Sequence, residues 1–289
     1  MLAQRMVSCL VVTIGLIAVG CATEPTGNPV DGELLSVPLD TMAPGDPQDD
    51  PPGSKNGFLP ACFWDPNVIE GLRKYAVGAI WTSPSNATYG TLPANSTMDL
   101  VPLACRAEAL KYLARCAMPK DTFVYDTLTG DRYWGWLNLS TPWLTGALPT
   151  DDQWWVTACM LQHLNGYHVE VPLLLDGART ELYSPSASHP EFVYRDSRLW
   201  GNLFDTSTDF VAYACYEDDL NDACTEFTVV DTRICDSDPT LECNLNILGP
   251  CSDVCTPVKS GYQCPDSGMK HVGSRLKDFS SMYGTVCGP

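Results

Sequence analysis

The first strong pattern along the chain is a helical spacing of apolar residues between 102 and 117. Apolar positions recur there every three or four residues, while Glu108, Lys111 and Arg115 share another face. Pro119 closes the segment, because proline cannot continue a helix. The pattern predicts an amphipathic helix with one face against a core.

A second helix is predicted to begin at the sequence TDDQ. Thr150 is the expected N-cap, Gln153 completes a capping box, and the two aspartates between them suit the positive end of the helix dipole. Gly166 marks the expected end. Residues 154–164 are apolar around nearly the whole circumference, so this helix is expected to be buried.

Short runs rich in β-branched and aromatic residues predict strands. They are FVYDT from 123, HVEVPLLL from 168, EFVY from 191, DFVAYACY from 209 and EFTVV from 226. Pro172 makes the second run an expected edge or bulged strand. The predicted fold class is α+β, with two helices packed on a mostly antiparallel sheet and a disulfide-rich C-terminal portion.

Residues 1–20 have the pattern of a signal peptide. Arg5 precedes an apolar stretch from 6 to 20, which is short for a membrane span. The glycine before Cys21 resembles the bacterial lipoprotein box, although Ala18 stands where that box usually has leucine. We therefore predict lipidation at Cys21. The alternative is ordinary signal cleavage, which gives a secreted protein.

The number of cysteines favours the lipid anchor. Of 14 cysteines, Cys9 leaves with the signal and an acylated Cys21 cannot form a disulfide, which leaves an even number. Because Ala22 rather than aspartate follows Cys21, the expected location is the outer membrane of the cell envelope. The predicted disulfide cysteines are Cys62, Cys105, Cys116, Cys159, Cys215, Cys224, Cys235, Cys243, Cys251, Cys255, Cys264 and Cys287.

Residues 21–57 are predicted to form an acidic, proline-rich tether. They hold seven prolines and seven acidic residues but a single lysine. Such a segment buries too little apolar surface to offset its ordering entropy. The alternative is an extension that packs on the domain through ELLSVPL.

The remainder divides by cysteine density into an α+β body, 58–214, and a disulfide-rich C-terminal subdomain, 215–289. Eight cysteines lie in the subdomain. It has few long apolar runs, so covalent loops are expected to replace part of a core.

Helix geometry limits the pairing of the body cysteines. Cys105 and Cys116 lie roughly 16 Å apart along one predicted helix, beyond the ~7 Å limit for a bridge. Each needs a partner elsewhere, and Cys62 and Cys159 are the simplest candidates. Four cysteines still allow three pairings.

Charge and motifs narrow the function. The formal net charge of −18 argues against nucleic acid and against electrostatic docking on anionic lipid, and it favours solubility at a crowded surface. The sequence has no G-x-S-x-G, H-E-x-x-H, P-loop or C-x-x-C motif. No catalytic residue and no cofactor is predicted. The expected membrane contact is through the lipid anchor only, and the expected partner is an unidentified protein or glycan.

Two groups could ligate a metal. His163, His168 and Glu170 straddle a helix end, where ordinary helix-end histidines are the favoured interpretation. An acidic group suits calcium, although a solvated loop is favoured because the D-x-D-x-D-G pattern is missing. This group is Glu217, Asp218, Asp219 and Asp222.

The aromatic run DRYWGWLNLSTPW is a candidate stacking surface for glycans. The alternative is a loop whose rings fill the core, and this alternative is favoured because exposed tryptophans are a liability unless they are used. The candidate ligand-binding residues are Tyr133, Trp134, Trp136 and Trp143.

The segments ALKYLARCAMP, GALPTDDQWWVTACMLQHLNGYHVEVPL, GNLF and VAYAC, in this order, resemble an uncharacterised family of cysteine-rich secreted proteins and lipoproteins of predatory soil bacteria. The resemblance covers about residues 100–264 and departs at 195–200, RDSRLW. It implies no activity, since none is known for the family, and it implies a scaffold role for the matching residues. These are Cys116, Trp155, Cys159, Asn165, Gly201, Asn202 and Cys215.

The sequence therefore predicts an envelope-anchored, disulfide-stabilised, non-catalytic protein for surface binding or structural contact. The alternative is a secreted hydrolase that acts on envelope or prey polymers.

The anchor is testable by Cys21→Ala. This substitution removes the only sulfur that an acyl chain can use at the predicted site, so the protein should leave the membrane fraction. Fractionation and mass spectrometry of the mature N-terminus measure the outcome. A variant that still sediments with membranes and keeps the same N-terminal mass contradicts the anchor.

Overall fold

The computed structural model describes residues 54–81, 89–167, 171–182, 189–217, 226–236, 238, 240–258 and 261–276. The chain divides into two units, 1–46 and 47–289, and all described residues belong to the second. The predicted signal peptide, Cys21 and nearly all of the predicted tether lie outside the described residues.

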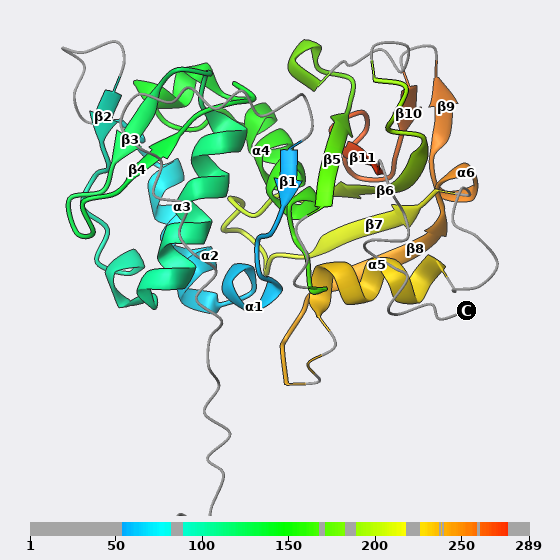
Figure 1. Ribbon diagram of the computed structural model, residues 1–289, viewed down its shortest axis with the longest axis horizontal. Coiled ribbons are helices and arrows are strands. Elements are labelled where there is room, and N and C mark those ends of the chain that lie inside the picture. Colours follow the sequence, from blue (N-terminus) through cyan, green and yellow to red (C-terminus); the bar gives the residue numbers. More distant parts are fainter. Residues whose placement is uncertain are drawn as a thin grey trace, which may run out of the picture. The chain divides into compact units, whose positions relative to one another are not determined.

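A six-stranded sheet is the largest element of the fold (Figure 1), with the strand order β1-β5-β11-β6-β7-β8. Neighbours are antiparallel except for β7 and β8, which are parallel. The strands are β1 Ser54–Asn56, β5 Val171–Asp176, β6 Tyr194–Trp200, β7 Ala212–Tyr216, β8 Leu245–Pro250 and β11 Val272–Leu276.

Two smaller sheets accompany it. In the first, β3 pairs with β2 in parallel and with β4 in antiparallel orientation, and the second is an antiparallel hairpin. Their strands are β2 Tyr89–Thr91, β3 Phe123–Tyr125, β4 Arg132–Trp134, β9 Thr256–Val258 and β10 Gly261–Gln263. Helices and mixed, mainly antiparallel sheets confirm the predicted α+β class.

The described residues form six α-helices, and α4 and α5 lie on the six-stranded sheet. Helix α4 contacts β6 and β11, whereas α5 contacts β7 and β8 (Figure 1). Helix α3 packs on α4 and β4 instead. The helices are α1 Pro60–Phe63, α2 Pro66–Ala76, α3 Leu103–Ala117, α4 Thr150–Gln162, α5 Glu226–Cys235 and α6 Cys251–Val254.

Both predicted helices form, but the ends of α4 differ from the prediction. Its N-cap is Pro149, without a side-chain cap, so the capping box at Thr150 is wrong. It ends at Gln162 rather than near Gly166. Gly166 is required for another reason: an added Cβ would lie 2.3 Å from the carbonyl oxygen of Thr232 in α5.

Three strand predictions need correction. The run EFTVV from 226 opens helix α5, because burying Val230 and Ile234 on one side of a helix outweighs the β-propensity of the run. The run at 191 enters β6 only at Tyr194. β5 is not an edge strand, since Pro172 pairs with β1 and lies just beyond the end of the β11 pairing. A proline at the end of that pairing removes little of the ladder.

The six-stranded sheet extends across two of the predicted domain boundaries. Strand β1 lies within the predicted tether, and its three residues pair with β5. The boundary between 214 and 215 falls inside β7, and β11 inserts between β5 and β6. The C-terminal segment and the body therefore share one sheet.

A buried polar network joins the helices to the sheet. The Arg233 guanidinium of α5 lies 3.0 Å from the Asp196 carboxylate of β6, and both side chains are fully buried. Arg233 also donates to the carbonyl oxygens of Gln162 and Leu164 at 3.1 and 3.2 Å, which lie at the end of α4. Basic groups at this position satisfy helix-end carbonyl oxygens and suit the helix dipole. Ser274 of β11 donates to Asp196 at 2.9 Å.

Five disulfides join ten of the twelve predicted cysteines. Cys62 pairs with Cys105 and Cys116 with Cys159, so the expected partners are confirmed. The remaining pairs are Cys215 with Cys251, Cys235 with Cys243, and Cys255 with Cys264. Cys224 and Cys287 lie outside the described residues. This density of bridges is typical of a protein that folds in an oxidising compartment.

Candidate functional site

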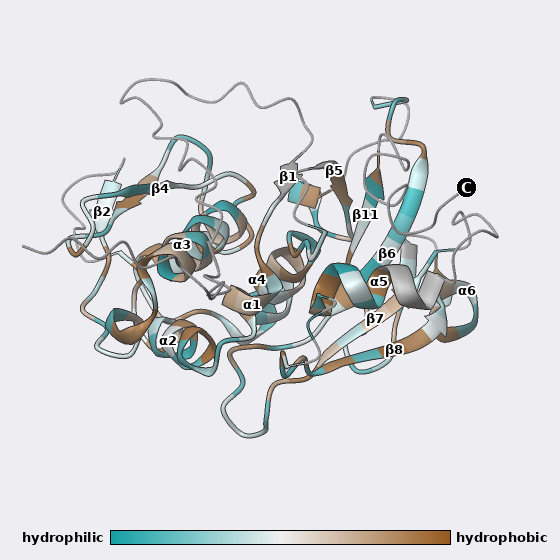
Figure 2. Ribbon diagram, turned by 60° about the horizontal axis from the view of Figure 1, so that its bottom comes forward, coloured by the Kyte–Doolittle hydropathy of each residue, from teal (hydrophilic) through white to brown (hydrophobic). Residues whose placement is uncertain are grey.

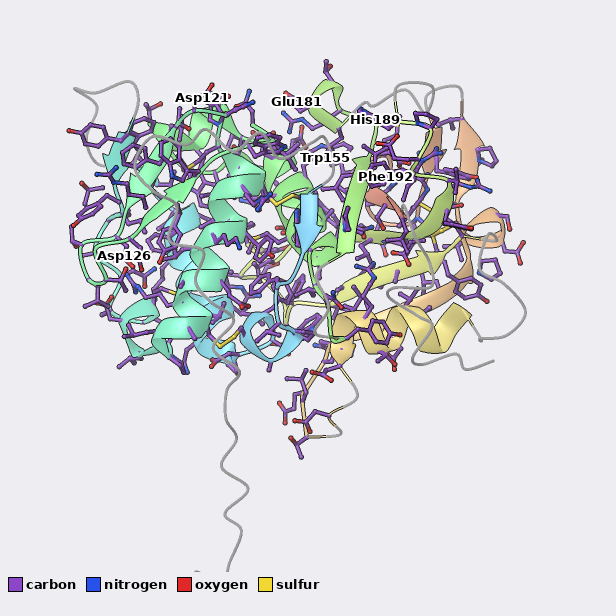
Figure 3. All side chains as sticks on the ribbon, in the orientation of Figure 1. Asp121, Asp126, Trp155, Glu181, His189 and Phe192 are labelled. Carbon is purple, nitrogen blue, oxygen red and sulfur yellow. A yellow bond between two sulfur atoms is a disulfide. The ribbon has the colours of Figure 1, made fainter. Side chains whose placement is uncertain are left out.

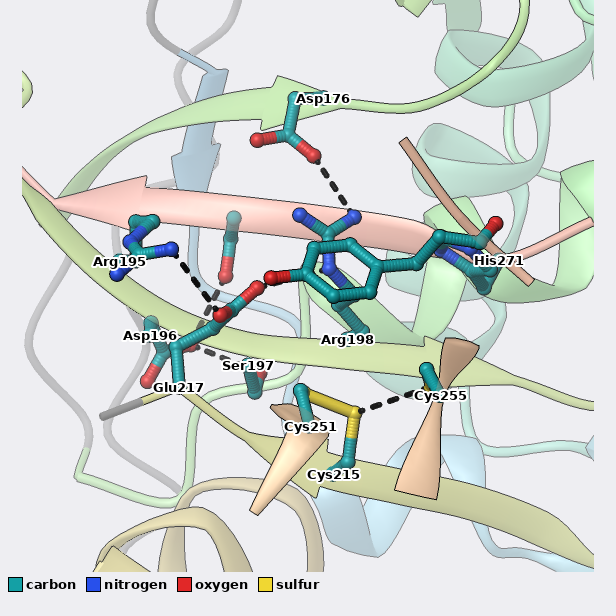
Figure 4. A network of polar contacts seen from close by, with 12 residues as sticks. Asp176, Arg195, Asp196, Ser197, Arg198, Cys215, Glu217, Cys251, Cys255 and His271 are labelled. Atoms are coloured by element: carbon teal, nitrogen blue, oxygen red, sulfur yellow. Dashed lines mark hydrogen bonds and ion pairs between the residues drawn. A yellow bond between two sulfur atoms is a disulfide. The ribbon is translucent and has the colours of Figure 1, made fainter. Parts of the chain in front are cut away.

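Charged side chains gather on the face of the sheet that the hairpin β9–β10 covers (Figure 4). Arg198 lies at the centre, 3.2 Å from a carboxylate oxygen of Asp176 and 2.8 Å from one of Glu217. Arg275 reaches Asp176 at 3.3 Å, and Arg195 reaches Glu217 at 3.6 Å. We call these five residues the arginine cluster. Figure 2 shows a hydrophilic stretch of β6, the strand that carries Arg195 and Arg198.

The sheet register assembles the arginine cluster. Gly273 of β11 pairs with Asp176 of β5 on one side and with Arg198 of β6 on the other. A Cβ on Gly273 would lie 2.5 Å from the Asp176 carboxylate and 3.0 Å from the Arg198 guanidinium. The missing side chain therefore lets the ion pair cross over β11.

An aromatic ring and a histidine cover the cluster. The Arg198 guanidinium lies 4.6 Å from the ring centre of Tyr262 in β10, which is a cation–π contact. His271 Nε2 donates to the Tyr262 carbonyl oxygen at 3.0 Å. Burial lowers the pKa of His271 to about 4, so the ring is neutral near pH 7. Its Nδ1 has no hydrogen-bond partner among the described residues.

Glu217, the one described member of the predicted calcium group, belongs to the arginine cluster and pairs with arginines there. Both of its carboxylate oxygens lie against guanidinium groups. Burial raises the pKa of Glu217 above its ordinary value, and Arg198 and Arg195 offset only part of that increase. Asp218, Asp219 and Asp222 lie outside the described residues.

The predicted aromatic residues divide into buried and half-buried pairs. Trp143 is fully buried, and its Nε1 donates to the carbonyl oxygens of Tyr75 and Gly78 at 3.0 and 3.1 Å. Tyr133 is also buried. Trp134 and Trp136 are half-buried, and the Lys120 ammonium lies 4.8 Å from the Trp136 ring centre.

Trp134 forms a row with two rings of neighbouring strands. Tyr89, Phe123 and Trp134 occupy matching positions of β2, β3 and β4. The ring centres of Tyr89 and Phe123 are 5.3 Å apart, and those of Phe123 and Trp134 are 4.7 Å apart. The Arg132 guanidinium lies 5.2 Å from the Phe123 ring centre. We call the three rings the aromatic row. Sequence reasoning missed Tyr89 and Phe123, although strand alternation in FVY places Phe123 opposite to a buried valine.

A buried ion pair fixes the three-stranded sheet on α3. Arg106 of α3 donates to both oxygens of Asp126, which follows β3, at 2.7 and 3.0 Å. Asp126 also accepts from the Leu128 amide at 3.0 Å. Figure 3 labels Asp126 in the part of the chain that holds α3 and β2–β4. The aromatic row therefore belongs to a sheet that a buried ion pair ties to α3.

The described residues place one group of possible metal ligands together: Cys116, Cys159 and His163 lie within 4.8 Å of one another. The two sulfur atoms form a disulfide, which makes them poor ligands. His163 Nδ1 donates to the Cys159 carbonyl oxygen at 2.8 Å. Burial and then the charge of Arg115 lower the pKa of His163 to about 3. His168 and Glu170 lie outside the described residues.

The residues that carry the sequence resemblance make internal contacts. Asn202 of the GNLF segment donates to Gln153 of α4 at 3.0 Å, and the Leu203 amide donates to the Thr157 hydroxyl at 3.1 Å. Asn165 is buried, and its backbone N–H donates to the Phe58 carbonyl oxygen at 2.9 Å. These contacts hold loops on α4.

No family model, curated protein or solved structure matches this chain. Within the ranges that the structure describes, no helix is long and apolar enough to cross a bilayer.

The buried histidine predicts an acid-dependent loss of stability. The unfolded chain protonates His163 near pH 6.5, whereas the folded chain resists protonation down to about 3. The neutral ring therefore makes its full contribution to the free energy of unfolding above about pH 6.5. This contribution is lost progressively as the pH falls from about 6.5 towards 3. His163→Asn keeps a donor for Cys159 but does not titrate, so its stability should fall about 2 kcal/mol less between pH 7 and pH 5.

Urea unfolding of wild type and His163→Asn at both pH values measures this difference. Equal losses in the two proteins contradict the assignment of a buried, neutral His163.

Proposed function

We propose that the protein is an envelope-anchored, non-catalytic binding protein whose contact surface is the aromatic row. The proposed anchor is a lipid on Cys21 at the outer membrane, and residues after it act as the tether. The single observation that carries the binding proposal is the row itself: Tyr89 is 42% exposed, and Phe123 and Trp134 are half-buried beside it.

The geometry of the row favours a glycan as the ligand. Tyr89 and Phe123 stack face to face with an interplanar angle of 10°, and Trp134 is tilted by 50° to Phe123, so the row presents a line of apolar ring edges across three strands. A sugar chain can pack its C–H groups along this line of rings, while Arg132 can donate to hydroxyl groups at its side. The support from the Arg106–Asp126 pair keeps the rings in place before binding, which reduces the entropy lost on contact.

The charge of the chain supports a neutral ligand. At a formal net charge of −18, long-range electrostatics oppose acidic polymers. The arginine cluster is a weaker candidate for the contact surface, because its carboxylates and guanidinium groups already pair with one another.

One observation favours the alternative of a secreted hydrolase. Glu217 is a buried carboxyl group with a raised pKa, which is the property of a general acid. The hydrolase alternative predicts that the wild-type protein hydrolyses an envelope polymer and that Glu217→Gln abolishes this activity without changing the stability of the protein. This result would replace the binding proposal.

The binding proposal is tested with Trp134→Ala and Tyr89→Ala. Loss of either ring should weaken binding to an insoluble neutral polysaccharide about tenfold, the effect of ~1.4 kcal/mol. Co-sedimentation measures binding, and circular dichroism confirms the fold. Leu128→Ala, which removes a 54%-exposed apolar side chain after β3, is the matched control and should bind like wild type.

Failure of the wild-type protein to bind neutral polysaccharides contradicts the role of the aromatic row, and so does a control variant that loses as much binding as the ring variants.

A further inference from the structure

Two of the disulfides touch each other. The sulfur of Cys215, which is bonded to Cys251, lies 3.8 Å from the sulfur of Cys255, which is bonded to Cys264. Figure 4 shows Cys255 beside the Cys215–Cys251 bridge. None of the other disulfides in the described ranges shows such a contact between sulfur atoms of different bridges.

The short helix α6 creates this contact. Cys251 is its first residue and Cys255 follows its last, so the two cysteines are one helical turn apart. Side chains four residues apart on a helix are neighbours, with about 5–6 Å between their Cβ atoms. Both sulfur atoms therefore face Cys215 of β7, and Cys215 is within reach of either.

We propose that Cys215, Cys251, Cys255 and Cys264 form a redox-active unit that accepts two electrons from an external dithiol and passes them inward by disulfide exchange. A thiolate of the dithiol attacks Cys264, forms a mixed disulfide and expels Cys255 as a thiolate. The second thiol of the dithiol then closes its own disulfide and releases Cys264, which takes up a proton.

The inner step follows at the contact. The Cys255 thiolate attacks the Cys215 sulfur, a Cys215–Cys255 bond forms, and Cys251 leaves as a thiolate that takes up the second proton. The dithiol has been oxidised to its disulfide. The protein has gained two electrons and two protons, held on Cys251 and Cys264.

Burial sets the direction of the relay. Cys255 and Cys264 are each 3% exposed, whereas Cys215 and Cys251 are completely buried. Of the two bridges, Cys255–Cys264 alone keeps any exposed surface, so an external dithiol reaches this bridge first when the hairpin β9–β10 opens. Arg198 lies opposite Cys215 in the sheet register, so the exchange takes place beside the arginine cluster.

The exchange changes how the hairpin is attached. In the oxidised protein, Cys255–Cys264 closes the base of the hairpin β9–β10, and the hairpin supplies Tyr262 over Arg198. After exchange, Cys255 ties the chain directly to β7 and the Cys264 end is released. The uptake of two electrons by this unit thus loosens the hairpin that lies over the arginine cluster.

The first test is Cys264→Ser, which leaves Cys255 without its partner. The exchange predicts that rapid alkylation after acid denaturation labels Cys251 as well as Cys255, with at least a tenth of the label on Cys251. The matched control is Cys105→Ser, which leaves Cys62 without its partner and with no other described disulfide in contact. This variant should be labelled on Cys62 alone. Label on Cys255 alone in Cys264→Ser overturns the proposal.

Wild-type protein gives a second readout that does not depend on folding of a variant. After treatment with one equivalent of dithiothreitol, peptide mass spectrometry should find a Cys215–Cys255 linked peptide, with free thiols at Cys251 and Cys264. Free thiols at Cys255 and Cys264 with an intact Cys215–Cys251 bridge overturn the relay.

Discussion

The fold depends on one buried ion pair, Arg233 with Asp196. Two charges without contact with water are tolerated only when further hydrogen bonds satisfy most of their donors and acceptors, and of the buried side-chain atoms of this pair only Arg233 Nε lacks a hydrogen-bond partner among the described residues. Here the guanidinium also donates to Gln162 Oε1 at 3.1 Å and to the Ser197 hydroxyl at 2.8 Å. Gln162 in turn donates to carbonyl oxygens of β6 and β11. The pair therefore fixes the end of α4, helix α5 and two central strands in a single arrangement.

The two faces of β6 explain why structure and candidate chemistry meet there. Asp196 enters the buried network, while Arg198 on the same strand organises the arginine cluster on the face that the hairpin covers. The cluster and the touching disulfides share this second face through Cys215, which pairs with Arg198. The aromatic row rests on a separate buried pair, Arg106 with Asp126.

Residue patterns within short segments predicted the helices and strands that depend mainly on those segments. Helix α3 follows apolar periodicity, the runs from 123, 168 and 209 that are rich in β-branched and aromatic residues contain strands, and helix geometry excluded a Cys105–Cys116 bridge. Helix α5 was missed because its first residues are β-branched and resemble a strand. The tertiary contact between Arg233 and Asp196, which favours the helix, joins residues far apart in the sequence. The fate of individual aromatics was also unpredictable, since tertiary contacts alone bury Trp143 and leave Trp134 half-buried. The position of Glu217 among arginines of other strands likewise depends on sheet register.

The most direct measurement is a double-mutant cycle on the ion pair, with Arg233→Met, Asp196→Leu and the double variant unfolded in urea with disulfides intact. Each single variant leaves an uncompensated buried charge, so each should lose about 3–5 kcal/mol, and the double variant should lose clearly less than their sum. Single losses below about 1 kcal/mol that add in the double variant would contradict the dependence of the fold on this pair.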